Sequence, residues 1–229
     1  MIQKGRRRFM NYLAIDTSTM ISTVTVADEK EILGDFNVNQ VKTHSESLVP
    51  MIENLLKLLG MTVADIDKFV IAEGPGSFTG LRIGMTIAKT LAQVEKKDLI
   101  TVSTLKAMAA GSISQRAKLP LIDARSTRVY GALYDENLEE IVPANLYEID
   151  NLAKIVNEKG LEIEMLGLLN DKYFDKFERA KKAPINLNNC IGKGLIRIAQ
   201  EENLEARPLY EISPNYLRKS QAEREFKKK

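Results

Sequence analysis

One kind of segment occurs twice in the chain, and this repeat limits the possible folds more than any other feature. Residues 15–28 and 122–135 have equal length, and each opens with Ile-Asp, passes through a short polar loop and returns as an alternating strand that ends in Asp. Alternation of apolar and small polar residues predicts a β-hairpin. Two related halves are one interpretation. A chance likeness between two amphipathic hairpins is the other.

The elements around the repeat predict an α/β protein. Two or three antiparallel strands from Tyr12 precede a helix, a buried strand at 69–72, a long helix from Phe78 and another strand at 99–102. The alternation then restarts. A duplicated α/β chain whose halves open on an Asp-bearing hairpin is typical of actin and hexokinase. We therefore predict a two-lobed, actin-like (ASKHA, ribonuclease H-like) fold, with lobes at 11–104 and 105–218.

Composition narrows the class of protein. The 229 residues are 44% hydrophobic and 28% charged, as in ordinary globular proteins. No stretch approaches the roughly 20 apolar residues of a membrane span, and Cys190 is the only cysteine. We expect a cytoplasmic protein without disulfides that does not bind membranes. The basic ends, 1–10 and 219–229, are interpreted as solvated tails rather than RNA contacts, and Met10 is an alternative start.

A stripe of small residues marks the helix from Phe78 to Val94. Gly80, Gly84, Ala88 and Ala92 recur every four residues, so another backbone can approach closely. Two glycines inside a helix cost about 1 kcal/mol each relative to alanine, which close packing must offset. A partner helix could cover this stripe. Packing within the chain is the alternative.

The loop before this helix, Gly74-Pro75-Gly76-Ser77, joins a strand to a helix start. Such a loop can hold a phosphate on free amides. It lacks the lysine of a P-loop and the spacing of a dinucleotide turn, so a structural turn capped by Ser77 is favoured.

The two hairpin aspartates, Asp16 and Asp123, stand where actin-like ATPases place carboxylates near magnesium and phosphate. Those enzymes need glycine beside the aspartate, so that amides can approach phosphate oxygens. This chain has Asp16-Thr17-Ser18 and Asp123-Ala124-Arg125 instead. We predict a vestigial nucleotide site at Asp16, Ser18, Asp123 and Arg125. Arg125 is expected to fill the site or to pair with one of the aspartates.

His44 is the only histidine, so neither a His-His metal pair nor a Ser-His-Asp triad can form. The position four residues later, which could complete such a metal pair, is Leu48. A hydrogen-bonded histidine at a helix start is the favoured role, with acid/base use as the alternative. We predict no metal site and no catalytic residue.

Five strings of the chain resemble the successive signatures of the TsaB family, formerly called YeaZ, in the TsaD or glycoprotease-like superfamily. They are LAIDTS at 13–18, HSESLVPMIENLL at 44–56, GPGSFTGLRIG at 74–84, VSTLKAMA at 102–109 and IDAR at 122–125. A closing motif at 214–218 is also similar, whereas the intervening region matches only loosely.

The resemblance implies a role in making threonylcarbamoyladenosine at position 37 of tRNAs that read ANN codons. The family member is a non-catalytic scaffold that acts with TsaD, the transferase, and TsaE, an ATPase, and meets tRNA through the complex. It needs no cofactor of its own, while the complex uses ATP and Mg²⁺. It pairs with TsaD, or with itself when alone, through helices of the first half. The interface residues carried over by position are Leu48, Ile52, Leu55, Phe78, Gly80, Leu81, Gly84, Met85, Ala88 and Ala92.

Two other classes remain open: an ATP-dependent small-molecule kinase of the same fold, and a glycoprotease-like metallopeptidase. The missing glycines beside the aspartates count against the first. The missing metal ligands count against the second.

Overall fold

The structure is a computed structural model that describes residues 9–39, 44–188, 190–202, 204 and 206–217. The predicted tails therefore lie almost wholly outside the described residues. The elements in chain order are β1 (Tyr12–Asp16), β2 (Ile21–Ala27), β3 (Ile32–Asn39), α1 (His44–Leu58), η1 (Val63–Asp65), β4 (Lys68–Gly74), α2 (Phe78–Glu95), β5 (Asp98–Ser103), α3 (Thr104–Ala110), β6 (Ala117–Asp123), β7 (Arg128–Tyr134), β8 (Glu140–Glu148), α4 (Ile149–Glu158), β9 (Ile163–Leu166), α5 (Asn170–Tyr173), η2 (Phe174–Lys176), β10 (Ala180–Lys182) and α6 (Ile191–Glu201).

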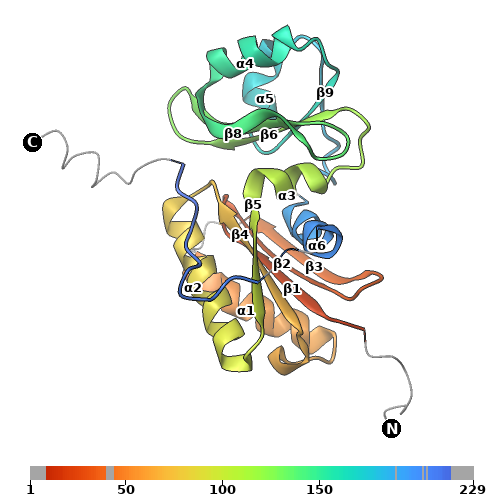
Figure 1. The fold of residues 1–229 in the computed structure, drawn as a ribbon, viewed down its shortest axis with the longest axis vertical. Coiled ribbons are helices and arrows are strands. Elements are labelled where there is room, and N and C mark those ends of the chain that lie inside the picture. The colour runs from red at the N-terminus through yellow and green to blue at the C-terminus, as the bar shows by residue number, and fades with distance from the viewer. Residues whose placement is uncertain (1–8, 40–43, 189, 203, 205, 218–229) are drawn as a thin grey trace, which may run out of the picture.

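The two sheets have the same topology. The first has the order β3-β2-β1-β4-β5, and the second, read from its β8 edge, has β8-β7-β6-β9-β10. In each, the opening strand pairs antiparallel with the next strand and parallel with the fourth. The hairpin loops also match, at residues 17–20 and 124–127. The repeated topology and the two-lobed α/β fold are confirmed (Figure 1).

The core is layered across both sheets (Figure 1). One face of the first sheet packs on α1 and α2 through residues such as Leu13, Ile71 and Leu48. Its other face shares a second apolar cluster with α3, α6 and the inner face of the second sheet. The outer face of the second sheet packs on α4. Because both faces of the first sheet are covered, its central strands are buried throughout.

Helices α3 and α6 do not follow the predicted lobe boundary. Both belong to 105–218 by sequence, yet α6 packs against β1, β2, β4 and β5 of the first sheet and against α3. Ile191 and Leu195 of α6 are fully buried there. The assignment of α6 to the second lobe is therefore corrected, because its apolar face covers the first sheet.

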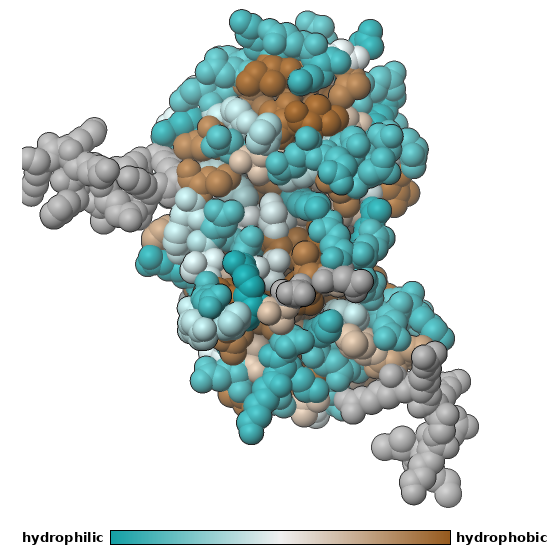
Figure 2. Space-filling view, viewed as in Figure 1, coloured by the Kyte–Doolittle hydropathy of each residue, from teal (hydrophilic) through white to brown (hydrophobic). Residues whose placement is uncertain are grey.

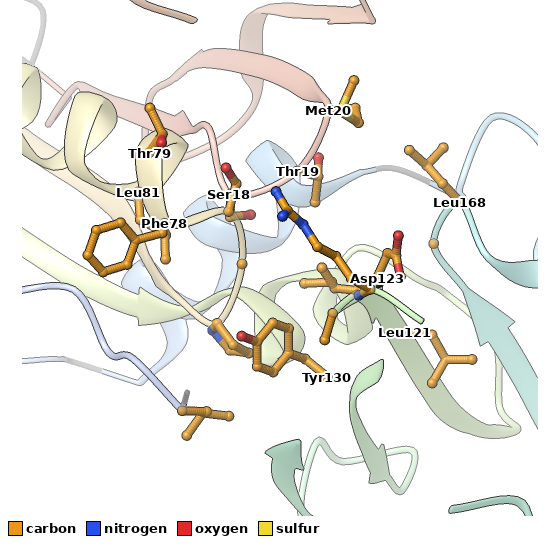
Figure 3. Close-up of a pocket in the computed structure, with 18 of the residues that line it drawn as sticks. Ser18, Thr19, Met20, Phe78, Thr79, Leu81, Leu121, Asp123, Tyr130 and Leu168 are labelled. Carbon is orange, nitrogen blue, oxygen red and sulfur yellow. Dashed lines mark hydrogen bonds between the residues drawn. The ribbon is translucent and has the colours of Figure 1, made fainter. Parts of the chain in front are cut away.

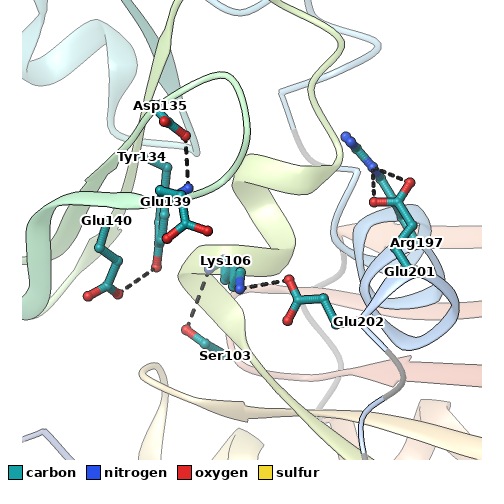
Figure 4. A network of polar contacts seen from close by, with 9 residues as sticks. All are labelled: Ser103, Lys106, Tyr134, Asp135, Glu139, Glu140, Arg197, Glu201 and Glu202. Carbon is teal, nitrogen blue, oxygen red and sulfur yellow. Dashed lines mark hydrogen bonds and ion pairs between the residues drawn. The ribbon is translucent and has the colours of Figure 1, made fainter.

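Polar contacts at the ends of α3 and α6 reinforce this junction (Figure 4). Lys106 of α3 forms an ion pair with Glu202, just beyond α6, at 2.7 Å, while Arg197 binds Glu201 within α6. Hydrophilic residues cover most of the face in Figure 2, with hydrophobic residues on both lobes and at the waist between them. The second lobe is thus held on the first by a shared apolar core, and the charged pairs stabilise the helices that lie between the two sheets.

Candidate functional site

A cleft of about 930 Å³ lies between the two lobes. Ser18, Thr19 and Met20 of the first hairpin loop border it, and Asp123 and Arg125 of the second border it as well (Figure 3). Pro75, Gly76 and Ser77, together with the first turn of α2, form a third wall. Of the predicted vestigial positions, Ser18, Asp123 and Arg125 meet at this cleft, whereas Asp16 lies outside its lining.

The two hairpin aspartates make the same local turn. Asp16 Oδ1 accepts a hydrogen bond from the Ser18 amide at 3.0 Å, and Asp123 Oδ1 accepts one from the Arg125 amide at 2.9 Å. Their surroundings differ, since Asp16 is fully buried and Asp123 is exposed. Burial raises the pKa of Asp16 to about 6, against the effect of its hydrogen bonds.

Arg125 forms no ion pair within the described part of the chain, so its expected pairing with an aspartate is wrong. Its backbone is left-handed, with φ of 70°, and its side chain is exposed at the cleft. The guanidinium is thus available to the cleft.

Helix α2 sits directly on the first hairpin. Thr17 Oγ1 donates to the Gly80 carbonyl at 2.7 Å, and the Ser77 amide donates to the Ser18 carbonyl at 2.7 Å. A Cβ atom at Gly80 or Gly84 would overlap Thr17. The glycines therefore permit this close approach. Thr17, which replaces the glycine of actin-like ATPases, holds the helix in place.

The predicted contact edge of α2 is wrong as a surface for a partner. Packing within the chain, the alternative reading of the small stripe, is correct, because the stripe faces the chain's own first sheet. Of the ten predicted interface residues, only Phe78 is partly exposed. The others are buried within the first lobe: Leu48, Ile52, Leu55, Gly80, Leu81, Gly84, Met85, Ala88 and Ala92.

The same two helices carry exposed apolar residues beside their buried ones, and these residues were not among the predicted interface positions. On α2, Ile83, Ile87 and Leu91 are partly exposed at four-residue spacing, and Val94 is 70% exposed. On α1, Leu58 is 75% exposed and Val49 is 42% exposed. The spacing of 83, 87 and 91 was the available signal. We call these six residues, which flank the buried stripes of the two helices, the outer face of α1 and α2.

A C-terminal segment, residues 206–217, runs along α2. Ile212 is buried there and its carbonyl accepts a hydrogen bond from Lys89 Nζ at 3.0 Å. Arg207 pairs with Glu73 at 2.7 Å. The segment has no periodic pattern, so only its likeness to a family motif at 214–218 indicated a role.

At the start of α2 this segment adds an aromatic cluster. The rings of Phe78 and Tyr216 lie 4.6 Å apart, and the Arg82 guanidinium is 3.9 Å from the Phe78 ring centre. Arg82 Nε donates to Tyr216 Oη at 3.0 Å. Arg82 therefore joins α2 to the C-terminal segment beside the cleft.

His44 is a hydrogen-bonded histidine at the start of α1, as predicted. Its Nε2 donates to the Thr19 carbonyl at 3.0 Å, which leaves Nδ1 to accept from Ser22 Oγ at 2.7 Å. The histidine thus fixes the first hairpin loop. No group of three His, Cys, Asp or Glu residues within the described ranges is placed to hold a metal ion. None of the described helices is long and apolar enough to cross a membrane.

Two sheets of the same topology, each opening on an Asp-bearing hairpin at a shared cleft, define an actin-like protein. Comparison with solved structures agrees. A Pseudomonas aeruginosa protein described as similar to peptidase YEAZ matches with a TM-score of 0.76 at 23% identity, over 91% of this chain and 100% of that one.

Sequence comparisons identify the family within this class. A family model described as TsaD, tRNA N6-adenosine threonylcarbamoyltransferase, matches residues 31–196. The tRNA threonylcarbamoyladenosine biosynthesis protein TsaB of Bacillus subtilis is 31% identical over 93% of this chain and 96% of its own length. The protein of the same name from Escherichia coli is 38% identical over 56% of this chain and 57% of its own. The chain belongs to the TsaB family, which confirms the resemblance seen in its sequence.

Proposed function

We propose that this chain is a TsaB-type subunit in the formation of threonylcarbamoyladenosine at position 37 of tRNAs that read ANN codons. It acts as a non-catalytic scaffold beside a TsaD-like transferase and a TsaE-like ATPase in the cytoplasm. ATP and Mg²⁺ serve the complex, and tRNA is met through it. The near full-length match to a relative named for this biosynthesis supports the role.

The observation that carries the scaffold proposal is the outer face of α1 and α2. Leu58 and Val94 are among the most exposed apolar side chains of the described residues, and Ile83, Ile87 and Leu91 extend the apolar surface along α2. Exposed apolar surface in contiguous patches commonly marks a protein interface. The proposed interface thus lies beside the buried stripe of α2 rather than on it. The TsaD-like subunit covers this face in the complex, and a second copy covers it when the chain is alone.

Nucleoside analysis of tRNA tests the role. Depletion of the protein from its own cells should lower threonylcarbamoyladenosine, and a plasmid copy of this sequence should restore it. A normal level of the modified nucleoside after depletion would overturn the family role.

A charge on the outer face tests the interface. Ile87→Glu should abolish co-purification with the TsaD-like protein of the same organism, because a carboxylate at the centre of an interface loses its hydration. Ile155→Glu is the matched control, since Ile155 is a partly exposed isoleucine on α4 of the second lobe. Circular dichroism should show both variants folded. Co-purification of the Ile87 variant at the wild-type level would place the interface elsewhere.

A further inference from the structure

The cleft between the lobes has one charged corner and several apolar side chains along its walls (Figure 3). The polar corner lies where the two hairpin loops meet the start of α2. Its charged residues are Arg125, Arg82 and Asp123. The apolar walls come from both lobes and include Met20, Phe78, Leu81, Leu121 and Leu168. A cleft of about 930 Å³ lined by charged, polar and apolar residues has the size of a small-molecule site.

Arg125 is the cation best placed to bind a ligand. It is exposed at the cleft and forms no ion pair within the described residues. Its backbone amide donates a hydrogen bond to Asp123 Oδ1 at 2.9 Å. This bond fixes the backbone and leaves the guanidinium free. Arg82, by contrast, is engaged with Phe78 and Tyr216. A planar guanidinium binds carboxylate and phosphate groups in two-pronged geometry.

Unpartnered polar groups lie across the cleft from Arg125. Ser18 lines the cleft and is 1% exposed, and its Oγ is near the Asp16 carboxyl without meeting it in hydrogen-bond geometry. The amides of Phe78 and Thr79, in the first turn of α2, have no acceptor within the described residues. A helix start with free amides favours a negative charge, and a buried hydroxyl without a partner is costly.

Two exposed apolar side chains also line the cleft. Met20 from the first hairpin loop is 65% exposed, and Leu168, from the loop after β9, is 50% exposed (Figure 3). They belong to different lobes and line the same cleft. Apolar side chains held in water beside a cationic corner suit a ligand that carries an apolar body as well as a charge.

We propose that this cleft binds a small organic anion, with its carboxylate or phosphate group at Arg125, Ser18 and the start of α2 and its apolar body against Met20 and Leu168. Arg125 then acts as a recognition residue. The site is separate from the outer face of α1 and α2, so its failure would leave the proposed scaffold role intact.

Titration of the ¹⁵N-labelled full chain with phenyl phosphate tests the site by amide chemical shifts. Benzoate asks whether a carboxylate serves equally, while phenol and inorganic phosphate supply the body and the charge alone. We expect saturable shifts near Ser18, Thr79 and Arg125 with concentrations up to about 10 mM, which detects millimolar dissociation constants. Phenol and inorganic phosphate should bind at least about tenfold more weakly. No saturable shift with either aryl anion, or equal binding of phenol, would overturn the proposal.

Arg125→Gln provides the decisive variant, because glutamine keeps the length of the stem but not the charge. It should weaken the aryl anion by about tenfold, whereas Arg179→Gln, on an exposed arginine that binds the Gly160 carbonyl, should not. Ser18→Ala should weaken it by about threefold. Unchanged affinity in the Arg125 variant would overturn the assignment.

The affinities of Arg125→Gly for Mg-ATP and for phenyl phosphate show whether Arg125 recognises an anion or only blocks a nucleotide site. If Arg125 only fills a vestigial nucleotide site, the glycine variant gains affinity for Mg-ATP and leaves phenyl phosphate unchanged. That result would overturn the proposal. If Arg125 recognises an anion, the glycine variant loses phenyl phosphate affinity.

Discussion

The two hairpins at the cleft are alike in sequence pattern and topology, but their surroundings in the structure differ. Each has a four-residue loop, and in each the aspartate accepts a hydrogen bond from the amide two residues later. In the first, α2 lies on Thr17, and Asp16 is fully buried at the end of the central strand β1. In the second, the corresponding position after β9 holds only the short α5, Asn170–Tyr173, and Asp123 stays exposed. The burial of the carboxyl, rather than the hairpin turn itself, sets the pKa of the aspartate.

Disturbing the close contact between α2 and the first hairpin should have the largest effect on stability. In Gly80→Ala the new Cβ meets the Thr17 backbone carbonyl, which cannot rotate away, so we expect a loss of about 3 kcal/mol in the free energy of unfolding. Helix propensity alone predicts a gain of about 1 kcal/mol. Urea denaturation measures the difference, with Thr86→Ala on the exposed side of α2 as control. A more stable Gly80 variant would show that the helix is free to shift.

Neutralising Asp16 should have the next largest effect, and one that depends on pH. Its pKa in the folded chain is about 6 against 3.8 for an ordinary aspartate, so the folded state binds more protons between these values and stability falls as pH rises. Ionisation costs about 3 kcal/mol above pH 6. Asp16→Asn should therefore be more favourable at pH 7.5 than at pH 4 by about 2 to 3 kcal/mol. Denaturation at both pH values measures this, and a pH-independent effect would contradict burial of the charge.

Relieving the left-handed backbone of the second hairpin loop, residues 124–127, should have a smaller effect. It should stabilise the protein, whereas Gly80→Ala should destabilise it. Ser126 has a φ of 62°, which glycine adopts without steric cost. We expect Ser126→Gly to raise the free energy of unfolding by up to about 1 kcal/mol. Thr19→Gly in the first loop has no positive φ to relieve and should be destabilising. Thermal denaturation of the two variants and the wild-type protein measures the difference in stability. A loss in the Ser126 variant equal to that of Thr19 would mean that this loop is not strained.

The smallest effect is expected for Asp123, the counterpart of Asp16. Because its carboxylate is exposed, Asp123→Asn should change stability by less than about 0.5 kcal/mol at either pH. The same denaturation series provides the measurement. A pH-dependent gain similar to that of Asp16 would show that the two hairpins are buried alike.

The repeated fold was predictable because it depends on local patterns. Equal segments at 15–28 and 122–135 predicted the two hairpins, and the pattern around 69–102 predicted the strands and helix of the first lobe. The third strand of the second sheet, β8, was not predicted, since a proline and polar residues interrupt its alternation. Edge strands carry weak patterns because one side faces solvent.

The candidate site was predictable only in part. The meeting of Ser18, Asp123 and Arg125 followed from the fold. The side of α2 that faces solvent did not, because small residues suit either a partner or a sheet of the same chain. Contacts from Tyr216 to Phe78 and Arg82 join residues more than 130 positions apart and leave no local signal.

The return of α6 to the first sheet bears on the order of synthesis. A chain that has emerged only as far as Ser103 contains all five strands of that sheet but lacks the helices that cover one of its faces. Tyr12, Val70 and Ile100 on that face would remain in water until Ile191 and Leu195 are made. The first lobe therefore completes its folding only near the end of translation, and a fragment that stops after β5 should aggregate rather than fold.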